Sequence, residues 1–191
     1  QDFLVQRKNA VARVHEKDDR VGLVDRAEDL RAHLGEDVVL FLAGEEYGVG
    51  ILDVQEVKAW EGVTQIPNAP AHVKGVLDLR GTIVPIVDLR TRFGLPAQEY
   101  GITTVIVVLK LEQAGDSQVI GVVVDAVSDV MDVTDSQIKD APDFNGDVQS
   151  LFIRGLASLN NKLVILLDTN RLLSQGELTK LKKQAGRTNG H

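Results

Sequence analysis

The chain has 191 residues, of which 43% are hydrophobic and 26% are charged, so its length and composition are those of a globular protein that can bury a core. The formal net charge of −7 argues against nonspecific binding of nucleic acid, because such binding needs a dense surface of lysine and arginine. The chain has no cysteine, which excludes disulfides and thiolate chemistry and fits a reducing cytosol.

The sequence contains no signal peptide and no apolar run of about 18 residues or more, so we predict that the chain neither crosses a membrane nor is exported. It begins at Gln1 and its only methionine is Met131, which predicts a natural product that is longer at its N-terminus.

Residues 1–36 are rich in charge and poor in aromatic side chains, and we predict that they form an N-terminal extension outside the core. Asp25 and Glu28 have the spacing of a capping box, and Gly35 is a typical helix stop. A short helix is therefore expected at 26–34.

From Val38 onward the chain consists of short runs rich in β-branched residues, separated by turns that contain Gly, Asn, Asp or Pro. Many short strands at close spacing predict a barrel or a sandwich instead of alternating strands and helices. The expected strands are 38–43, 47–57, 75–80, 82–89, 103–110, 118–130, 152–159 and 162–168.

The core is expected to end in a helix. Ser174 and Glu177 have capping-box spacing, and Leu178 and Leu181 follow three residues apart. We predict a single core domain at 37–182 and a flexible tail at 183–191.

An internal repeat runs through the core. Residues 73–93 align without a gap on 153–173, and residues 47–57 align on 120–130 in the same order. Two matches in the same order predict a duplicated small barrel, with about five strands in each copy and a groove where the two copies meet.

The sequence offers no catalytic, metal or cofactor site. None of its four histidines stands at a metal-ligand spacing from a carboxylate or a second histidine: His15, His33, His72 and His191. The acidic run 143–147 lacks the glycine and glutamate positions of a calcium loop, and no phosphate-binding loop or nucleophile elbow is present. We therefore predict that the chain is not an enzyme and takes no cofactor.

The strand sequences resemble the CheW family of bacterial chemotaxis coupling proteins over about residues 37–182. The resemblance is carried by EEYGVGILDVQEV, VTQIPNAPAHVKGVLDLRGTIVPIVDLRTRFG, VIGVVVDAVSDV and LVILLD, and the block LRGxIxPxxDLR is highly specific to the family. It implies an all-β fold of two interlocked five-stranded Src-homology-3-like barrels, in agreement with the repeat.

The resemblance also implies a scaffold without catalysis, which couples the cytoplasmic tips of chemoreceptors to the regulatory domain of the histidine kinase CheA. It would be cytoplasmic, at membrane-associated receptor arrays, with no nucleic acid and no membrane insertion. The partner-binding residues implied by position are Ile51, Val54, Glu56, Lys74, Gly75, Arg80, Ile83, Val105, Gly121 and Val130.

Arg80 and Gly81 are expected to form a tight hairpin turn, because glycine supplies the backbone freedom that such a turn needs. The family usually has Asn where this chain has Asp78. Two interpretations of Arg80 remain open: a solvent-facing contact for a partner, or an ion pair with Asp78 or Asp88 that closes the turn. Pro85 has no N–H to donate, so its strand is expected to be an edge or bulged at that point.

Three hypotheses for the function remain open from the sequence. The first is a stand-alone adaptor. The second is the same module within a larger protein, such as a receiver-fused coupling protein, a kinase regulatory domain or a polar-localisation protein. The third is an acidic barrel enzyme or a small-ligand-binding protein with an unrecognised site.

Overall fold

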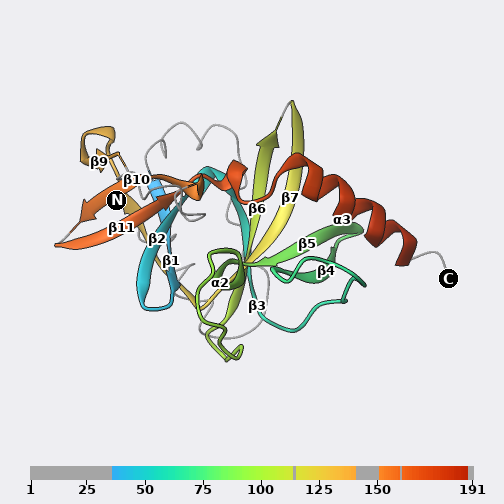
Figure 1. The fold of residues 1–191 in the computed structure, drawn as a ribbon. Coiled ribbons are helices and arrows are strands. Elements are labelled where there is room, and N and C mark those ends of the chain that lie inside the picture. Colours follow the sequence, from blue (N-terminus) through green and yellow to red (C-terminus); the bar gives the residue numbers. More distant parts are fainter. Residues whose placement is uncertain (1–35, 114, 141–150, 160, 189–191) are drawn as a thin grey trace.

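The computed structural model describes residues 36–113, 115–140, 151–159 and 161–188 (Figure 1). The predicted helix at 26–34 lies outside these residues. None of the helices in the described part of the chain is long and apolar enough to span a bilayer.

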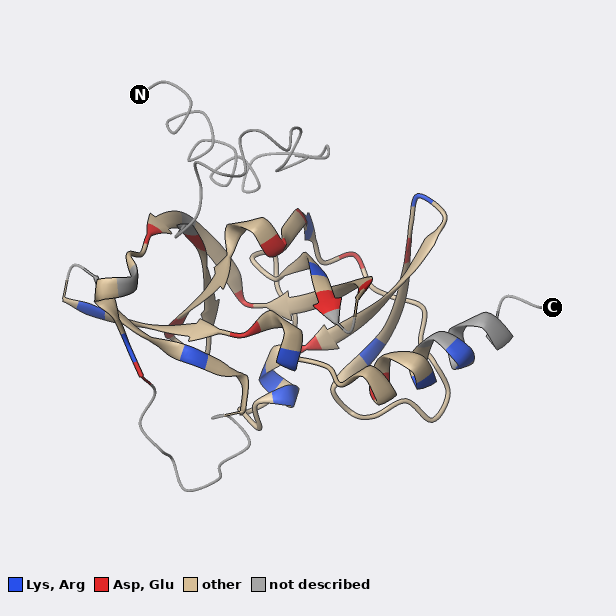
Figure 2. Ribbon diagram, turned by 90° about the horizontal axis from the view of Figure 1, so that it is seen from above, with Lys and Arg blue, Asp and Glu red and all other residues tan. Residues whose placement is uncertain are grey.

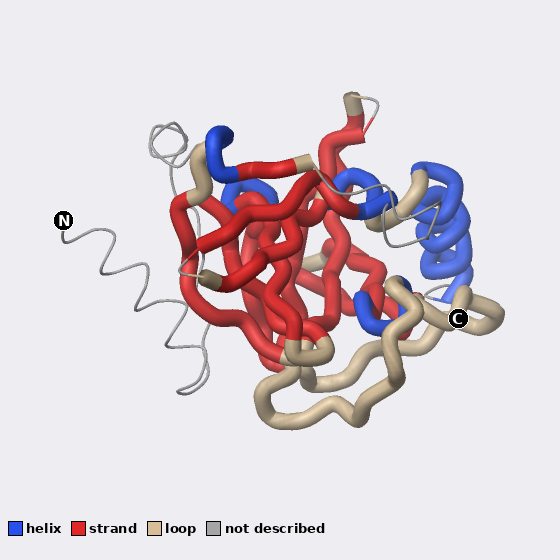
Figure 3. Tube along the Cα trace, turned by 60° about the vertical axis from the view of Figure 1, so that its left-hand side comes forward, coloured by secondary structure: helices blue, strands red, loops and turns tan. Residues whose placement is uncertain are grey.

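Strands make up most of the described chain, and its helices are few and lie at the outside of the strand layers (Figure 3). The strands are β1 (Glu36–Leu42), β2 (Glu45–Gly50), β3 (Val54–Ala59), β4 (Val73–Leu79), β5 (Thr82–Asp88), β6 (Val105–Gln113), β7 (Asp116–Val124), β8 (Ala126–Asp132), β9 (Ile138–Lys139), β10 (Ile153–Leu159) and β11 (Lys162–Leu167). The helical elements are η3 (Ile51–Asp53), α2 (Leu89–Arg92), η4 (Asp135–Gln137), η6 (Thr169–Arg171) and α3 (Gln175–Thr188).

All eight predicted strand regions contain strands, but two of them are broken. The region 47–57 is interrupted by η3, and the region 118–130 is divided at Asp125 into β7 and β8. The short strand β9 and the single helical turn α2 were not predicted. α2 forms because the Asp88 carboxylate accepts hydrogen bonds from the backbone nitrogens of Arg90 and Thr91, which caps its first turn.

The strands form two sheets, which confirms the predicted all-β fold class. The six-stranded sheet has the order β8-β1-β2-β11-β10-β9, and the five-stranded sheet has the order β3-β6-β7-β5-β4. The chain passes from the first sheet to the second between β2 and β3, and back again between β7 and β8. Each sheet therefore contains two strands from the other half of the repeat, β1 and β2 in the first sheet and β6 and β7 in the second, and the two halves are interlocked.

The predicted repeat is confirmed by the strand register. In the five-stranded sheet, β5 runs parallel to β7 and pairs Ile86 with Gly121. In the six-stranded sheet, β11 runs parallel to β2 and pairs Leu166 with Gly48. These are the positions that the alignments of 73–93 on 153–173 and of 47–57 on 120–130 place on one another.

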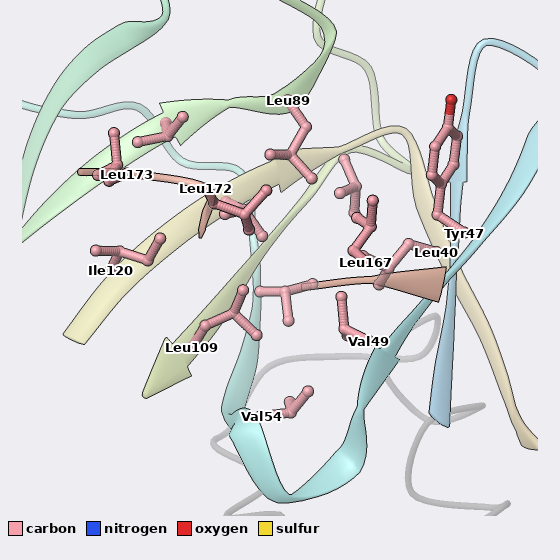
Figure 4. Packing of buried hydrophobic residues seen from close by; sticks show 14 of the residues in the cluster. Leu40, Tyr47, Val49, Val54, Leu89, Leu109, Ile120, Leu167, Leu172 and Leu173 are labelled. Carbon is pink, nitrogen blue, oxygen red and sulfur yellow. The ribbon is translucent and has the colours of Figure 1, made fainter. Parts of the chain in front are cut away.

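The largest hydrophobic cluster joins the two halves. Figure 4 shows Leu40 and Val49, from β1 and β2, converging with Leu109 and Ile120 of β6 and β7. All four side chains are fully buried. Burial of apolar surface stabilises a fold by about 25 cal/mol per Å². The apolar surface buried in this shared core is therefore the main source of free energy that holds the two sheets together.

The C-terminal helix begins as the sequence predicts. The backbone nitrogen and hydroxyl of Ser174 donate to Glu177 Oε2, each at 2.8 Å, and the Glu177 nitrogen donates back to Ser174 Oγ at 3.2 Å. Leu178 and Leu181 are buried in the central cluster. α3 continues to Thr188, so 183–188 are helical where the sequence predicted a flexible tail.

Candidate functional site

The hairpin between β4 and β5 turns at Arg80 and Gly81, which have φ angles of 54° and 84°. Positive φ at both central residues is the signature of the type I′ turn, which matches the twist of the strands that it connects. The backbone nitrogen of Gly81 donates to Asp78 Oδ1 at 2.7 Å. The Asp78 carboxylate therefore stabilises the turn itself.

Arg80 pairs with a residue that the sequence did not suggest. Its Nη2 donates to Glu56 Oε2 on β3, and the interpretation that paired it with Asp78 or Asp88 is wrong. Asp78 accepts from the turn, whereas Asp88 accepts from the hydroxyl of Tyr100 at 2.7 Å.

The Arg80–Glu56 pair connects the two edges of the five-stranded sheet, because β3 and β4 are its outermost strands. The Arg80 side chain is 75% exposed, but that of Glu56 is only 11% exposed. A largely buried carboxylate thus holds one end of a guanidinium that is otherwise mostly exposed to solvent.

An open groove of about 560 Å³ lies beside this pair. Its apolar lining comes from four strands and η3, and its charged lining residues are Glu56, Arg80 and Lys110. The lining residues are Leu52, Val54, Gln55, Glu56, Leu79, Arg80, Thr82, Val84, Lys110 and Val119. Among these, Leu52 is 38% exposed, one of the few large apolar side chains that the described residues present to solvent.

The structure brings three of the ten predicted site residues to this groove, namely Val54, Glu56 and Arg80. Val54 is 0% exposed, so it lies beneath the surface and supports the floor. Ile51 and Val105 are buried in the central core, and neither lines the groove.

The other five predicted residues lie elsewhere. The ammonium of Lys74 lies 3.5 Å from Asp88 Oδ2. Ile83 is half-buried against a small cluster formed by Ile66 and Val76, and Val130 is half-buried against the central core.

Gly75 and Gly121 lie where neighbouring atoms approach closely. An added Cβ at Gly75 would lie 2.1 Å from the carbonyl oxygen of Thr64, and one at Gly121 would lie 2.5 Å from Ile86 Cδ1. Both glycines are therefore needed for packing within the sheet, whatever else they contact.

Seven lining residues were missed: Leu52, Gln55, Leu79, Thr82, Val84, Lys110 and Val119. Alternation along a continuous strand at 47–57 would place Leu52 on the same face as Val54 and Glu56, but Leu52 lies in η3, where strand alternation does not apply. Lys110 and Val119 reach the groove through the pairing of β3 with β6 and of β6 with β7, which strand patterning alone does not provide.

A second polar cluster ties the two halves together at the crossover from β7 to β8. Asp125 accepts from the backbone nitrogen of Ala43 at 2.8 Å and from Arg90 Nε at 2.7 Å. Burial alone would raise the pKa of the Asp125 carboxyl, but the hydrogen bonds from Arg90 and Ala43 outweigh burial and hold that pKa below its ordinary value. Asp125 uses both of its carboxylate oxygens in hydrogen bonds within the chain, so the role of this cluster is structural.

Figure 2 shows Asp and Glu as well as Lys and Arg along the ribbon of the described residues. Among the described residues, no group of three His, Asp or Glu side chains could hold a metal ion. The groove offers apolar surface, one exposed guanidinium and one ammonium, which suits recognition of a protein surface.

The model of the CheW-like domain matches residues 37–177. The chain is 42% identical over 146 residues to the chemotaxis protein CheW of Klebsiella aerogenes, covering 76% of this chain and 86% of that protein. It is 35% identical over 144 residues to the chemotaxis protein CheW of Rhizobium meliloti, covering 75% and 90%. The crystal structure of the scaffolding protein TtCheW from Thermoanaerobacter tengcongensis superposes with a TM-score of 0.66 at 30% identity, over 75% of this chain and 94% of that one.

Proposed function

Because the chain belongs to the CheW-like domain family, we propose that it is a chemotaxis adaptor that joins signalling proteins without catalysing a reaction. Its partners in this proposal are the regulatory domain of the histidine kinase CheA and the cytoplasmic tips of chemoreceptors. The chain would act in the cytoplasm, at membrane-associated arrays of these receptors.

The observation that carries the proposal is the groove beside Arg80. A guanidinium that is mostly exposed but fixed at one end by Glu56 loses little freedom when a second acceptor binds it, so it can contribute binding energy at low entropic cost. Apolar surface from Leu52 and Leu79 lies next to it, which gives the pattern of a binding site with an arginine anchor beside apolar contacts.

Two groups among the ten residues implied by the family resemblance have distinct roles in this proposal. Glu56 and Arg80 contact a partner or orient the contact. The buried members of the set, Ile51, Val54 and Val105 among them, act by keeping the sheets in place.

The test is a titration of the full chain against two separate probes, a receptor-tip fragment and the kinase regulatory domain. We expect both to bind, and a mixture of all three to form a ternary complex. Specific association at its weak end is still detectable at concentrations of about 100 μM. If one of the two probes does not bind the chain at that concentration, the adaptor proposal is contradicted.

The role of Arg80 is tested by Arg80→Glu with Arg154→Glu as the matched control. Arg154 is also an exposed arginine that pairs with a buried acid, since its Nη2 lies 3.1 Å from Asp37 Oδ2, and it does not line the groove. Both substitutions leave a carboxylate opposite a carboxylate. We expect Arg80→Glu to weaken binding of at least one probe by more than about tenfold, because like charges at an interface repel, and Arg154→Glu to leave binding unchanged.

A further inference from the structure

The repeat provides a matched pair of positions, Pro85 in β5 and Ile165 in β11. In the six-stranded sheet, the parallel ladder between β11 and β2 contains Ile165 and continues toward the hairpin turn as far as Val164, which pairs with Glu46. In the five-stranded sheet, the equivalent ladder between β5 and β7 stops at Ile86. Both ladders have three pairs, but in the sheet that contains Pro85 the ladder ends two residues farther from the hairpin turn.

The direction of the Pro85 nitrogen explains where the ladder stops. Leu79 and Thr82 flank a two-residue turn, so they form a hydrogen-bonded pair, and the antiparallel alternation makes Val76 and Pro85 a pair whose polar groups point away from each other. Val76 follows this rule, because its nitrogen donates to the carbonyl oxygen of Thr64 at 2.8 Å on the outer side.

The nitrogen of Pro85 consequently points toward β7. Proline has no N–H, so it cannot donate to the carbonyl group that the equivalent isoleucine reaches in the other half. β5 and β7 are free to separate from this point toward the turn, and Thr82 and Val84 of β5 line the groove together with Val119 of β7.

The other half closes the same region with an ion pair. The positions equivalent to Thr82 and Val119 are Lys162 and Glu46, and Lys162 Nζ lies 2.6 Å from Glu46 Oε1. The six-stranded sheet therefore joins its two parallel strands near the turn with a ladder that reaches closer to the turn and with a charged pair, where the five-stranded sheet has a groove.

We propose that Pro85 is a positioning residue: by ending the β5–β7 ladder it keeps open the groove in which the partner contacts Arg80. The binding part of this inference rests on the proposed function. The opening of the groove is a property of the chain alone. A proline that only stiffened β5 would act by reducing the freedom of the unfolded chain, and its loss would change stability and not binding.

The test uses Pro85→Ile, which copies the equivalent position, and Pro85→Ala, which restores the N–H without adding volume. Pro67→Ala is the control, because Pro67 is exposed and does not line the groove. Backbone amide hydrogen exchange, followed by NMR, reports whether residue 85 gains a partner. Titration with the receptor-tip fragment and the kinase regulatory domain reports binding.

We expect the amide of residue 85 to be protected at least about a hundredfold relative to an open loop amide in both variants, as in a formed ladder. Binding of the probe that Arg80→Glu weakens should fall by more than about tenfold, although the variants stay folded. Pro67→Ala should leave binding as in the unsubstituted chain.

An unprotected amide at residue 85 in both variants would overturn the inference, since the ladder would then end for another reason. Protection with unchanged binding would overturn the part that concerns the partner, and so would an equal loss in Pro67→Ala. If the unsubstituted chain binds neither probe, the proposed function fails, and the exchange data still decide whether Pro85 holds the strands apart.

Discussion

Asp88 and Asp168 hold the same place in the two halves of the chain. The backbone nitrogen of Asp88 donates to the carbonyl oxygen of His72, that of Asp168 donates to Phe152, and both distances are 2.8 Å. Each aspartate also caps the helical turn that follows its hairpin. The same backbone closure at two sites shows that the repeat fixes the frame, and that the differences between the halves lie in side chains such as Pro85 and Ile165.

The first prediction concerns the core of the five-stranded sheet. Ile86 is 0% exposed and packs with Ile106 and Val108. Ile86→Ala should lower the free energy of unfolding by about 2–5 kcal/mol, because it removes buried methyl groups and leaves a cavity. Urea denaturation measures this directly. Ile102→Ala is the control: Ile102 is fully exposed, so its change should stay within about 0.5 kcal/mol. If the two variants change the free energy of unfolding by similar amounts, the Ile86 side chain does not point into the core of the sheet.

The second prediction concerns Gly75. A Cβ at this position would lie 2.1 Å from a backbone carbonyl oxygen, which cannot move aside as a side chain can. Gly75→Ala should therefore destabilise the chain by about 1–3 kcal/mol and displace the bridge between Thr64 and Val76.

Gly101→Ala is its matched control, because nothing lies within 4 Å of a Cβ added there. That variant should melt close to the unsubstituted chain. A Gly75→Ala protein as stable as the control would show that the segment after β3 can move away from β4 without cost.

The third prediction concerns the coupling between Arg80 and Glu56. We expect a double-mutant cycle of Arg80→Ala and Glu56→Gln to give an interaction free energy of about 0.5–1 kcal/mol, since Arg80 is mostly exposed and solvent screens the pair. The value should fall in about 1 M salt, where the Debye length is only about 3 Å. A coupling of zero at low salt would show that the pair does not hold the edges of the sheet together.

Much of this fold could be predicted from the sequence, because apolar runs, turn residues and the repeat are local signals. The crossing of the chain between sheets could not. Residues 47–57 have the composition of one long strand, and only the three-dimensional structure shows the break at η3. The same limit applies to Arg80: the two acids close to it in sequence were the expected partners, whereas its actual partner Glu56 lies on β3, at the opposite edge of the sheet from β4. Only the three-dimensional structure shows that the two side chains meet.

The last prediction concerns pH and the docking of α3. His72 lies in a junction formed by three elements: its Nε2 is 3.4 Å from Arg92 Nη1 of α2 and 3.4 Å from Glu177 Oε1 of α3, and Lys74 of β4 lies nearby. Burial and the charge of Arg92 lower the pKa of His72 below its ordinary value of 6.5, and the attraction of Glu177 only partly offsets them. The unfolded chain therefore binds a proton at this residue before the folded chain does. Stability should fall as the pH drops below about 6.5 toward the folded pKa.

The measurement is the free energy of unfolding between pH 7.5 and 5, for the unsubstituted chain and for His72→Gln. The glutamine keeps a polar side chain but cannot titrate, so the variant should lose less stability over this range, with a difference on the order of 1 kcal/mol or less. Glu177 and Asp125 act in a lower window. Their pKa values are depressed in the folded chain, so the stability that they contribute is lost only as the pH falls through those values, below the ordinary carboxyl range. Parallel pH profiles for the two proteins would show that His72 protonates equally in the folded and unfolded chains, and that the junction with Arg92 does not disfavour its charge.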